Sequence, residues 1–312
     1  MTTVLVTGSS GFIGLNVCRQ LAEEGYKVYG IDVNRPPFEI PDTVELKLLD
    51  LTDAPDLPEG DVIVHLAAHS QVQPVVDNPS LAVENIQMTQ HVLEQAEQMG
   101  AFVINTSSRD VYGDGITPAE SDVTPDSPNG YAASKLGGEA IANAYSHTYD
   151  VPVTSLRLAN VYGPMDTNQR VLPIFISLAA NSQELTVYGE GKLLDFVYID
   201  DVCDAIISSI CRNEIVSGEA INIGSGSGTP LAEVAAYVAE SIEFCPGWSL
   251  SPDRSGDIGQ YVTDISKANG LLGFEPTVPL DQGLTQTINW YMDHNDVRET
   301  ILSRISSTGE DN

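Results

Sequence analysis

The sequence has few basic side chains. Its 312 residues include 14 lysines and arginines against 44 aspartates and glutamates, which gives a formal net charge of -30 at pH 7. Such a charge repels nucleic acid and anionic membranes, so neither is expected as a partner. The acids are scattered along the chain rather than collected in a tail. An acidic, lysine-poor surface resembles that of proteins from salt-saturated cytoplasms, where screening weakens the repulsion between like charges.

Cysteines are also few. The four, at positions 18, 203, 211 and 245, form no Cys-x-x-Cys pair and no metal-ligand spacing with histidines. No metal site is therefore predicted, and buried or inert thiols in a reducing compartment are expected. The sequence also lacks an apolar run of the ~18 residues that a membrane span needs, and no signal peptide precedes Val4. We therefore expect a cytoplasmic protein.

Glycines, by contrast, form an informative cluster near the start of the chain. The apolar run Val4–Val6 is typical of a buried strand and leads directly into Gly8-x-x-Gly11-x-x-Gly14, after which apolar residues follow at helical spacing. Glycines at a strand-to-helix turn let the backbone approach a pyrophosphate, and the helix N-terminus directs N–H donors at it. The turn is therefore predicted to bind a dinucleotide.

An acid at the end of the next strand specifies which dinucleotide. The strand Lys27–Ile31 is followed by Asp32, roughly 20 residues after the turn, where a carboxylate would bind the adenosine ribose hydroxyls. Its negative charge would repel a 2′-phosphate, which favours NAD over NADP, although Arg35 lies nearby.

Further apolar strands alternate with helical segments. We expect strands at Val44–Leu49, Val62–Leu66, Phe102–Asn105 and Val153–Leu158, and a helix over Pro79–Met99. This alternation predicts an α/β fold, a doubly wound parallel sheet of Rossmann type, with a second, smaller mixed α/β domain for the substrate. Ligands are expected at the carboxyl ends of the strands.

Tyr131 and Lys135 are separated by one turn of a predicted helix and share a face. A phenol, with a pKa near ~10, is a poor base at neutral pH. An ammonium one turn away is expected to lower that pKa toward the working range. Tyr131 could then take a proton from a sugar hydroxyl while hydride leaves the same carbon.

These features resemble, in one order along the chain, the extended short-chain dehydrogenase/reductase family of nucleotide-sugar epimerases and dehydratases. The likeness runs from the first strand to about Lys267. It implies bound NAD, a nucleotide-sugar substrate, a homodimer, and a catalytic set of Ser108, Tyr131 and Lys135. The residues that it implies for the cofactor are Gly8, Gly11, Phe12, Ile13, Gly14, Asp32, Asp50, Leu51, Leu66, Ala67, Ala68, Tyr131 and Lys135.

The segment after Ser108 bears on the reaction. Glucose-type dehydratases of the family carry Asp-Glu there, whereas this chain carries Arg109-Asp110. Arginine cannot act as an acid, so a two-carboxylate dehydratase is not expected. A decarboxylase or dehydratase that uses Asp110 alone stays possible by this resemblance, and Arg109 could pair with Asp110 or face a substrate anion. Epimerisation at C4 of a UDP-sugar makes the fewest demands on the sequence and is the prediction.

The resemblance places substrate contacts at Ser108, Asn160 and Arg254. A departure occurs at Leu194, where relatives usually carry an arginine that clamps the diphosphate. Another cation such as Arg170 could compensate, or the substrate could lack a nucleotide, which would make the protein an NAD-dependent aldose dehydrogenase. We expect residues 1–160, with 196–223, to bind the dinucleotide, and residues 161–195 and 224–312 to bind the substrate.

Overall fold

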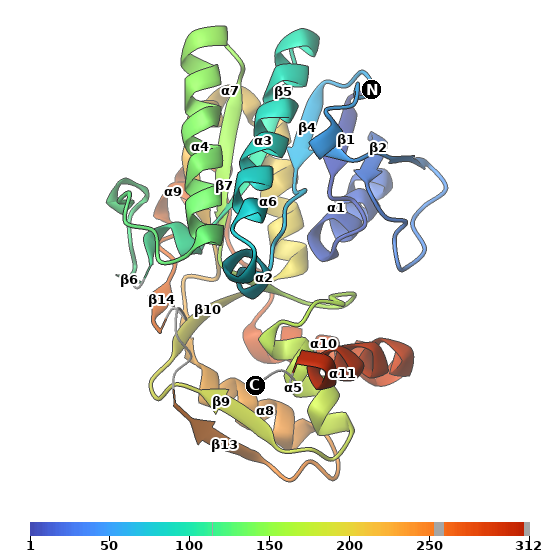
Figure 1. Cartoon of the computed structure of the whole chain (residues 1–312), viewed down its shortest axis with the longest axis vertical. Coiled ribbons are helices and arrows are strands. Elements are labelled where there is room, and N and C mark those ends of the chain that lie inside the picture. The colour runs from blue at the N-terminus through green and yellow to red at the C-terminus, as the bar shows by residue number, and fades with distance from the viewer. Residues whose placement is uncertain (114, 253–258, 309–312) are drawn as a thin grey trace.

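The larger half of the molecule is built on one parallel sheet. The computed structural model describes residues 1–113, 115–252 and 259–308. Seven strands lie in the order β11-β7-β5-β4-β1-β2-β3, and each neighbouring pair is parallel (Figure 1). The predicted doubly wound α/β fold is therefore confirmed. The strands are β1 (Thr3–Thr7), β2 (Lys27–Asp32), β3 (Val44–Leu48), β4 (Val62–His65), β5 (Phe102–Ser108), β7 (Val153–Leu158) and β11 (Ala220–Ile223).

Helices cover both faces of this sheet, because its inner strands are apolar on both sides. Val4 and Val64 pack toward one cluster of buried residues and Leu5 and Ile63 toward another, as the alternation along a strand requires. The helices α1 (Phe12–Glu23) and α6 (Ile199–Cys211) contact each other, as do α3 (Ser80–Met99) and α4 (Gly130–Tyr149). Shorter helical segments are η1 (Leu51–Asp53), α2 (Val72–Asp77), η2 (Arg109–Tyr112), η3 (Glu120–Asp122), α7 (Asn213–Val216) and α9 (Ser266–Leu272).

The smaller half is a mixed α/β unit, as predicted. Its three-stranded sheet joins β10 (Leu193–Tyr198) in parallel to β8 (Asn160–Tyr162) and antiparallel to β12 (Gly228–Pro230). Within the described ranges, no helix has the length and apolar content needed to cross a bilayer. The remaining elements are β6 (Gly115–Ile116), α5 (Val171–Ala180), β9 (Leu185–Tyr188), α8 (Leu231–Ser241), β13 (Trp248–Ser251), β14 (Tyr261–Val262), α10 (Leu280–Asp293) and α11 (Asn295–Thr308).

The C-terminal part of the chain is helical from Leu280 to Thr308 except at His294, where φ is -119° and ψ is 75° and α10 ends before α11 begins. The residues at the break include Asn295 and Asp296, whose short polar side chains compete with helical backbone hydrogen bonds. The expected assignment of residue ranges to two domains stays a prediction.

Candidate active site

A cleft of about 2740 Å³ separates the two halves. Ligand pockets usually measure roughly 300–1,000 Å³, so this cleft has room for more than one ligand. The glycine turn, the carboxyl ends of β2, β4 and β5, the start of α4 and residues 158–163 and 166–175 line it. All predicted site residues that the structure describes lie on its wall, while Arg254 falls outside the described residues.

The glycine turn leaves no room for side chains. Gly8 has a φ of +71°, and a Cβ atom there would lie 2.7 Å from the backbone nitrogen of Ala67. The backbone of the turn therefore packs directly against the segment after β4. A Cβ at Gly14 would meet the backbone of Gly8 in the same way. The result is a bare backbone cradle at the N-terminus of α1, which fits a pyrophosphate.

Asp32 lies beside this cradle at the end of β2. Its carboxylate accepts hydrogen bonds from the backbone N–H groups of Ser10 and Asn34, at 3.0 and 2.9 Å. These bonds hold the carboxylate at the mouth of the cradle, where ribose hydroxyls can reach it. Asp50 has a different local role: its side chain accepts hydrogen bonds from the backbone and side chain of Thr52, which lower the pKa of the Asp50 carboxyl.

The segment after β4 is fixed by a buried histidine. The ring of His65 makes hydrogen bonds with the hydroxyls of Thr7, at 2.8 Å, and Thr89, at 3.1 Å. Burial lowers the pKa of His65 to about 3, so the ring is neutral at physiological pH. The Thr7 hydroxyl also accepts a hydrogen bond from the backbone N–H of Ala67. Leu66, Ala67 and Ala68 are thereby held against the glycine turn.

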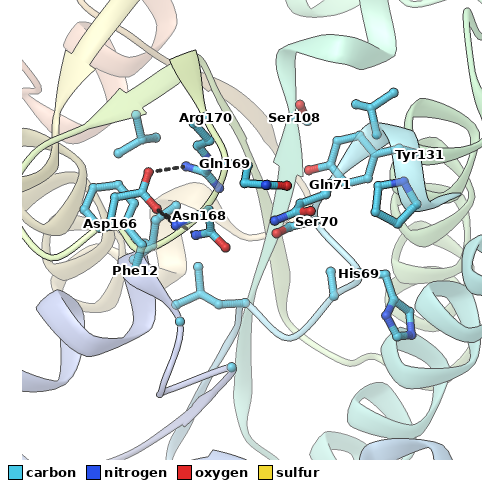
Figure 2. A pocket seen from close by; sticks show the side chains of 18 of the residues that line it. Phe12, His69, Ser70, Gln71, Ser108, Tyr131, Asp166, Asn168, Gln169 and Arg170 are labelled. Atoms are coloured by element: carbon cyan, nitrogen blue, oxygen red, sulfur yellow. Dashed lines mark hydrogen bonds and ion pairs between the residues drawn. The ribbon is translucent and has the colours of Figure 1, made fainter. Parts of the chain in front are cut away.

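Ser108, Tyr131 and Lys135 come together at the ends of β5 and α4. Figure 2 shows Ser108 and Tyr131 on the same wall of the cleft. The Ser108 hydroxyl accepts a hydrogen bond from the backbone N–H of Asp110 at 3.2 Å and makes a hydrogen bond with Tyr131. The Lys135 ammonium donates to the carbonyl of Thr106 at 2.9 Å. Asn129 caps α4 by accepting from the N–H of Ala132.

The pKa of Tyr131 is raised in the structure, whereas the helical spacing of Tyr131 and Lys135 predicts a lowered one. Burial raises the pKa of Tyr131 to about 12, and the negative charge of Asp110 acts in the same direction. Arg170, a hydrogen bond with Ser108 and Arg109 act in the opposite direction, but burial is the largest influence. Burial also lowers the pKa of Lys135 to about 8. Removal from water favours the neutral form of both groups. In each group this effect on the pKa is larger than the opposite effect that the helical spacing predicts.

Arg109 pairs with Asp110 rather than facing the cleft alone. Its Nε lies 3.3 Å from a carboxylate oxygen of Asp110, and its guanidinium lies 5.5 Å from the ring centroid of Tyr261. Both side chains of the pair are mostly buried. Asp110 is thus held at the cleft beside Tyr131, as its effect on the phenol indicates.

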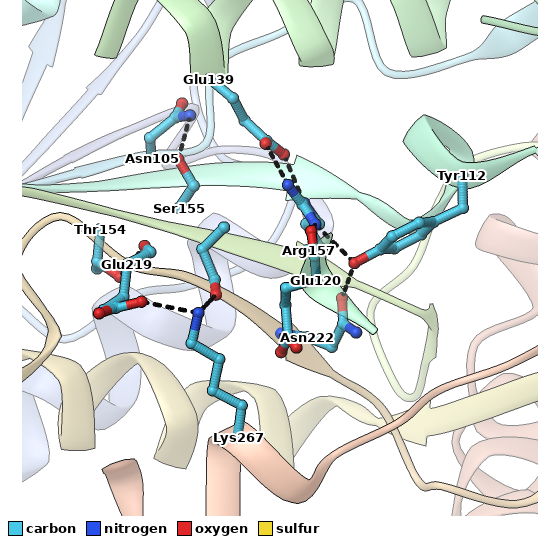
Figure 3. A network of polar contacts seen from close by, with 11 residues as sticks. Asn105, Tyr112, Glu120, Glu139, Thr154, Ser155, Arg157, Glu219, Asn222 and Lys267 are labelled. Carbon is cyan, nitrogen blue, oxygen red and sulfur yellow. Dashed lines mark hydrogen bonds and ion pairs between the residues drawn. The ribbon is translucent and has the colours of Figure 1, made fainter. Parts of the chain in front are cut away.

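A buried polar network fixes α4 and η2 from behind. Arg157 on β7 forms an ion pair with Glu139 at 2.7 Å and donates to the Tyr112 hydroxyl at 2.6 Å (Figure 3). Tyr112 in turn donates to the side chain of Asn222. Because the charges of this ion pair are paired and hydrogen-bonded, removing either partner would leave the other buried and uncompensated. The network therefore sets the position of the helix that carries Tyr131 and Lys135.

The opposite wall contains polar residues, of which sequence analysis had named only Arg170, as a possible substitute for the arginine that is missing at Leu194. Asn168, Gln169 and Arg170 lie across the cleft from Ser108 and Tyr131 (Figure 2). Arg170 lies 3.9 Å from the buried carboxylate of Asp166 and 5.8 Å from the ring centroid of Phe12. No motif marks Asn168 and Gln169 in the sequence.

The far end of the cleft is formed by the smaller half. Asn160 lines it and donates from its side-chain amide to the carbonyl of Asp195 at 2.9 Å. Leu194 is buried and lies on the cleft wall. Lys192, which sequence analysis did not select, lines the same region. Its position two residues before Leu194 was the available signal.

The fold and this cleft define a class of protein. Residues 4–224 match the model of the NAD dependent epimerase/dehydratase family, and the chain belongs to that family. Its cofactor is accordingly NAD, which the bare glycine cradle beside Asp32 fits.

Relatives of known name carry out more than one reaction. The chain is 30% identical to a probable UDP-glucuronate 4-epimerase of Rhizobium meliloti (strain 1021), over 92% of this chain and 96% of that protein. It is 31% identical to a dTDP-glucose 4,6-dehydratase of Streptomyces niveus, over 98% and 97%. Among solved structures, the UDP-glucose 4-epimerase of Thermotoga maritima with UDP-glucose superposes with a TM-score of 0.87 at 28% identity, covering 93% of this chain and 99% of that one.

Proposed function

We propose that the protein is a nucleotide-sugar 4-epimerase that inverts C4 of a UDP-sugar. In this proposal the glycine turn, Asp32 and the segments after β3 and β4 hold NAD, and Ser108 and Asn160 contact the sugar. The named relatives include UDP-sugar 4-epimerases of nearly the same length. The size of the cleft, about 2740 Å³, suits a dinucleotide and a nucleotide sugar together.

The chain's own residues manage the proton at O4 of the sugar. Bound NAD would supply the acceptor for the C4 hydride and the donor for its return. Tyr131, as phenolate, takes the proton of the C4 hydroxyl and gives it back when the hydride returns. Ser108, whose oxygen accepts from Asp110 N–H, directs its own proton at O4. Lys135 has N–H donors beyond the one bonded to Thr106, and these can hold a ribose hydroxyl.

The pairing of Arg109 with Asp110 is the observation that favours epimerisation over loss of water. Loss of water from a sugar needs an acid for the leaving hydroxyl and a base for the carbon proton. Between Ser108 and Tyr112 the chain has one carboxyl group, and it is engaged by a guanidinium that cannot give up a proton. Epimerisation needs neither group, only the proton exchange at O4.

The test is turnover with UDP-glucose, UDP-galactose and UDP-glucuronate in high salt, with products identified by mass and NMR. We expect an isomer of unchanged mass and no net NADH. Tyr131→Phe should reduce turnover by about 10²–10⁴-fold. Tyr149→Phe, which alters an exposed tyrosine on the same helix, is the matched control and should leave turnover unchanged. Wild-type turnover that survives in Tyr131→Phe would overturn the mechanism.

A second candidate reaction rests on the position of Asp110. This carboxyl lies at the cleft beside Tyr131, where it could assist loss of water or of carbon dioxide from a 4-keto sugar. A product lighter by either molecule, abolished in Asp110→Asn, would establish this reaction instead. Net NADH from a free aldose, with UDP-sugars unchanged, would establish an aldose dehydrogenase.

A further inference from the structure

The loop between β2 and β3 lies beside the cofactor cradle, and we call its residues 33–43 the strap. Asn34 and Pro37 of the strap line the cleft next to Asp32. The carbonyl of Asn34 accepts a hydrogen bond of 2.7 Å from the Ser10 hydroxyl, which ties this part of the strap to the glycine turn. Because Asp32 is placed to bind the adenosine ribose, the strap lies at the adenosine end of the cofactor site.

The middle of the strap is anchored to α10, a helix of the smaller half (Figure 1). The ring of Phe38 contacts the ring of Trp290 edge to face, with centroids 5.3 Å apart, and lies 6.3 Å from the ring of His294. Trp290 and His294 are stacked on each other, with centroids 4.1 Å apart. All three rings belong to the described residues and are half-buried, and none of the three lines the cleft. Phe38 therefore joins the strap to α10 and does not face the cofactor.

The anchor on α10 is held in place by the rest of the smaller half. The helix contacts α5, α8 and β10. The hydroxyl of Tyr291, which follows Trp290 in the chain, donates to the carbonyl of Asp166 on the cleft wall. The His294 ring makes a hydrogen bond of 2.7 Å with the Trp290 carbonyl. Movement of the strap away from the cradle therefore requires that its contact with Phe38 break or that α10 leave its own partners.

Prolines stiffen the strap between its anchor and the cleft. Pro36 and Pro37 immediately precede Phe38, and Pro41 follows three residues later. Each proline ring fixes φ near about −65°, so the backbone has few ways to bend at these positions. At the far end of the strap, the N–H of Val44 donates to the Pro41 carbonyl at 2.9 Å. The position of Phe38 therefore determines where the residues of the strap that line the cleft can lie.

We infer that the contact of Phe38 with Trp290 and His294 is a latch that keeps the strap over the adenosine end of NAD and slows release of the cofactor. Phe38 and Trp290 are positioning residues, since they act through the strap. The ring contacts must break before the strap can move, so they affect the rate at which NAD leaves. The inference concerns the cofactor alone and does not depend on which sugar reaction the enzyme performs.

The test is exchange of bound NAD for radiolabelled NAD in the purified holoenzyme, in high salt. Phe38→Ala should speed NAD release by about 10- to 100-fold, the range that corresponds to loss of a buried aromatic ring and its contacts. Trp290→Ala should speed release to a similar extent, although Trp290 lies in the smaller half and outside the cleft. The double variant should release NAD no faster than the faster single variant, because both changes remove the same contact.

The matched control is Phe244→Ala, which removes an exposed phenylalanine of the smaller half and should leave the release rate unchanged. Unchanged release in Phe38→Ala, with the fold intact by circular dichroism, would overturn the latch. Faster release in Phe38→Ala but not in folded Trp290→Ala would overturn it too, since Phe38 would then act without α10. Rate increases that multiply in the double variant would show two separate contacts instead of one latch. None of these results bears on epimerisation, which is tested by the products formed from UDP-sugars.

Discussion

At the start of α4, burial moves the pKa values of two neighbouring side chains in opposite directions. The neutral form is favoured in each, so the pKa of Tyr131 rises to about 12 and that of Lys135 falls to about 8. Only a small fraction of Tyr131 is therefore in the phenolate form, which the mechanism needs, near neutral pH. Charges placed around the phenol by Arg170 and Asp110 then set how much of it forms.

Opposite substitutions should move the pH profile in opposite directions. Arg170→Gln removes a positive charge that lowers the pKa of Tyr131, so the alkaline rise in kcat/KM should shift to higher pH. Asp110→Asn removes a negative charge that raises it, so the rise should shift to lower pH. The measurement is kcat/KM against pH at constant ionic strength. Shifts of the same sign in both variants would contradict this account.

Between elements, α3 and α4 pack closely against each other. A Cβ at Gly137 would lie 2.8 Å from the side chain of Ile86, so this glycine serves the contact of α4 with α3 within one chain. Three alanines on α4 do not take part in this packing. Ala133, Ala140 and Ala144 are exposed, so they stay available to a partner chain.

The homodimer is expected to form through these two helices. Ala140→Arg introduces a long charged side chain in the middle of the exposed alanine face, at little cost to helix stability, and should yield monomers. Ser303→Arg, at an exposed position of α11, is the matched control and should not change the mass. Light scattering after size-exclusion chromatography gives the mass of each. A wild-type monomer, or an Ala140→Arg dimer, would rule out this interface.

Local patterns predicted the elements of the sheet well. Each buried strand is a short apolar run, and a strand-to-helix turn is marked by glycine or by polar residues. They predicted the glycine turn and Asp32 for the same reason. Arg170 and Lys192 were harder to assign to the cleft, because they reach it from segments far away in sequence. The raised pKa of Tyr131 depends on burial by the whole fold. Burial cannot be inferred from the spacing of two residues along a helix.

Over the described part of the molecule, most acidic side chains lie outside the cleft, and six line it. The acids on the surface repel one another, and this repulsion opposes the compact state most strongly when salt is low. The Debye length falls from about 30 Å at 0.01 M salt to about 3 Å at 1 M.

We therefore predict that the free energy of unfolding rises with potassium chloride. Urea unfolding followed by circular dichroism should give a midpoint that increases steadily from 0.01 M to above 1 M salt, with loss of folded structure on dialysis to the lowest concentration. A protein of near-zero net charge, unfolded in the same buffers, is the control, since it has little self-repulsion for salt to screen. A midpoint independent of salt would mean that the acidic surface is no adaptation to a salt-rich cytoplasm.

The edge strand β11 has a consequence for biosynthesis. It pairs with β7, yet β8, α5, β9 and β10 of the smaller half are synthesised between the two strands. A nascent chain that has just passed residue 195 thus exposes the unpaired edge of β7 and the apolar sheet surface that α6 will cover. The larger half comes first in the chain but is completed only after residue 223 has left the ribosome. During that interval the unfinished sheet is the part most prone to pair with other chains.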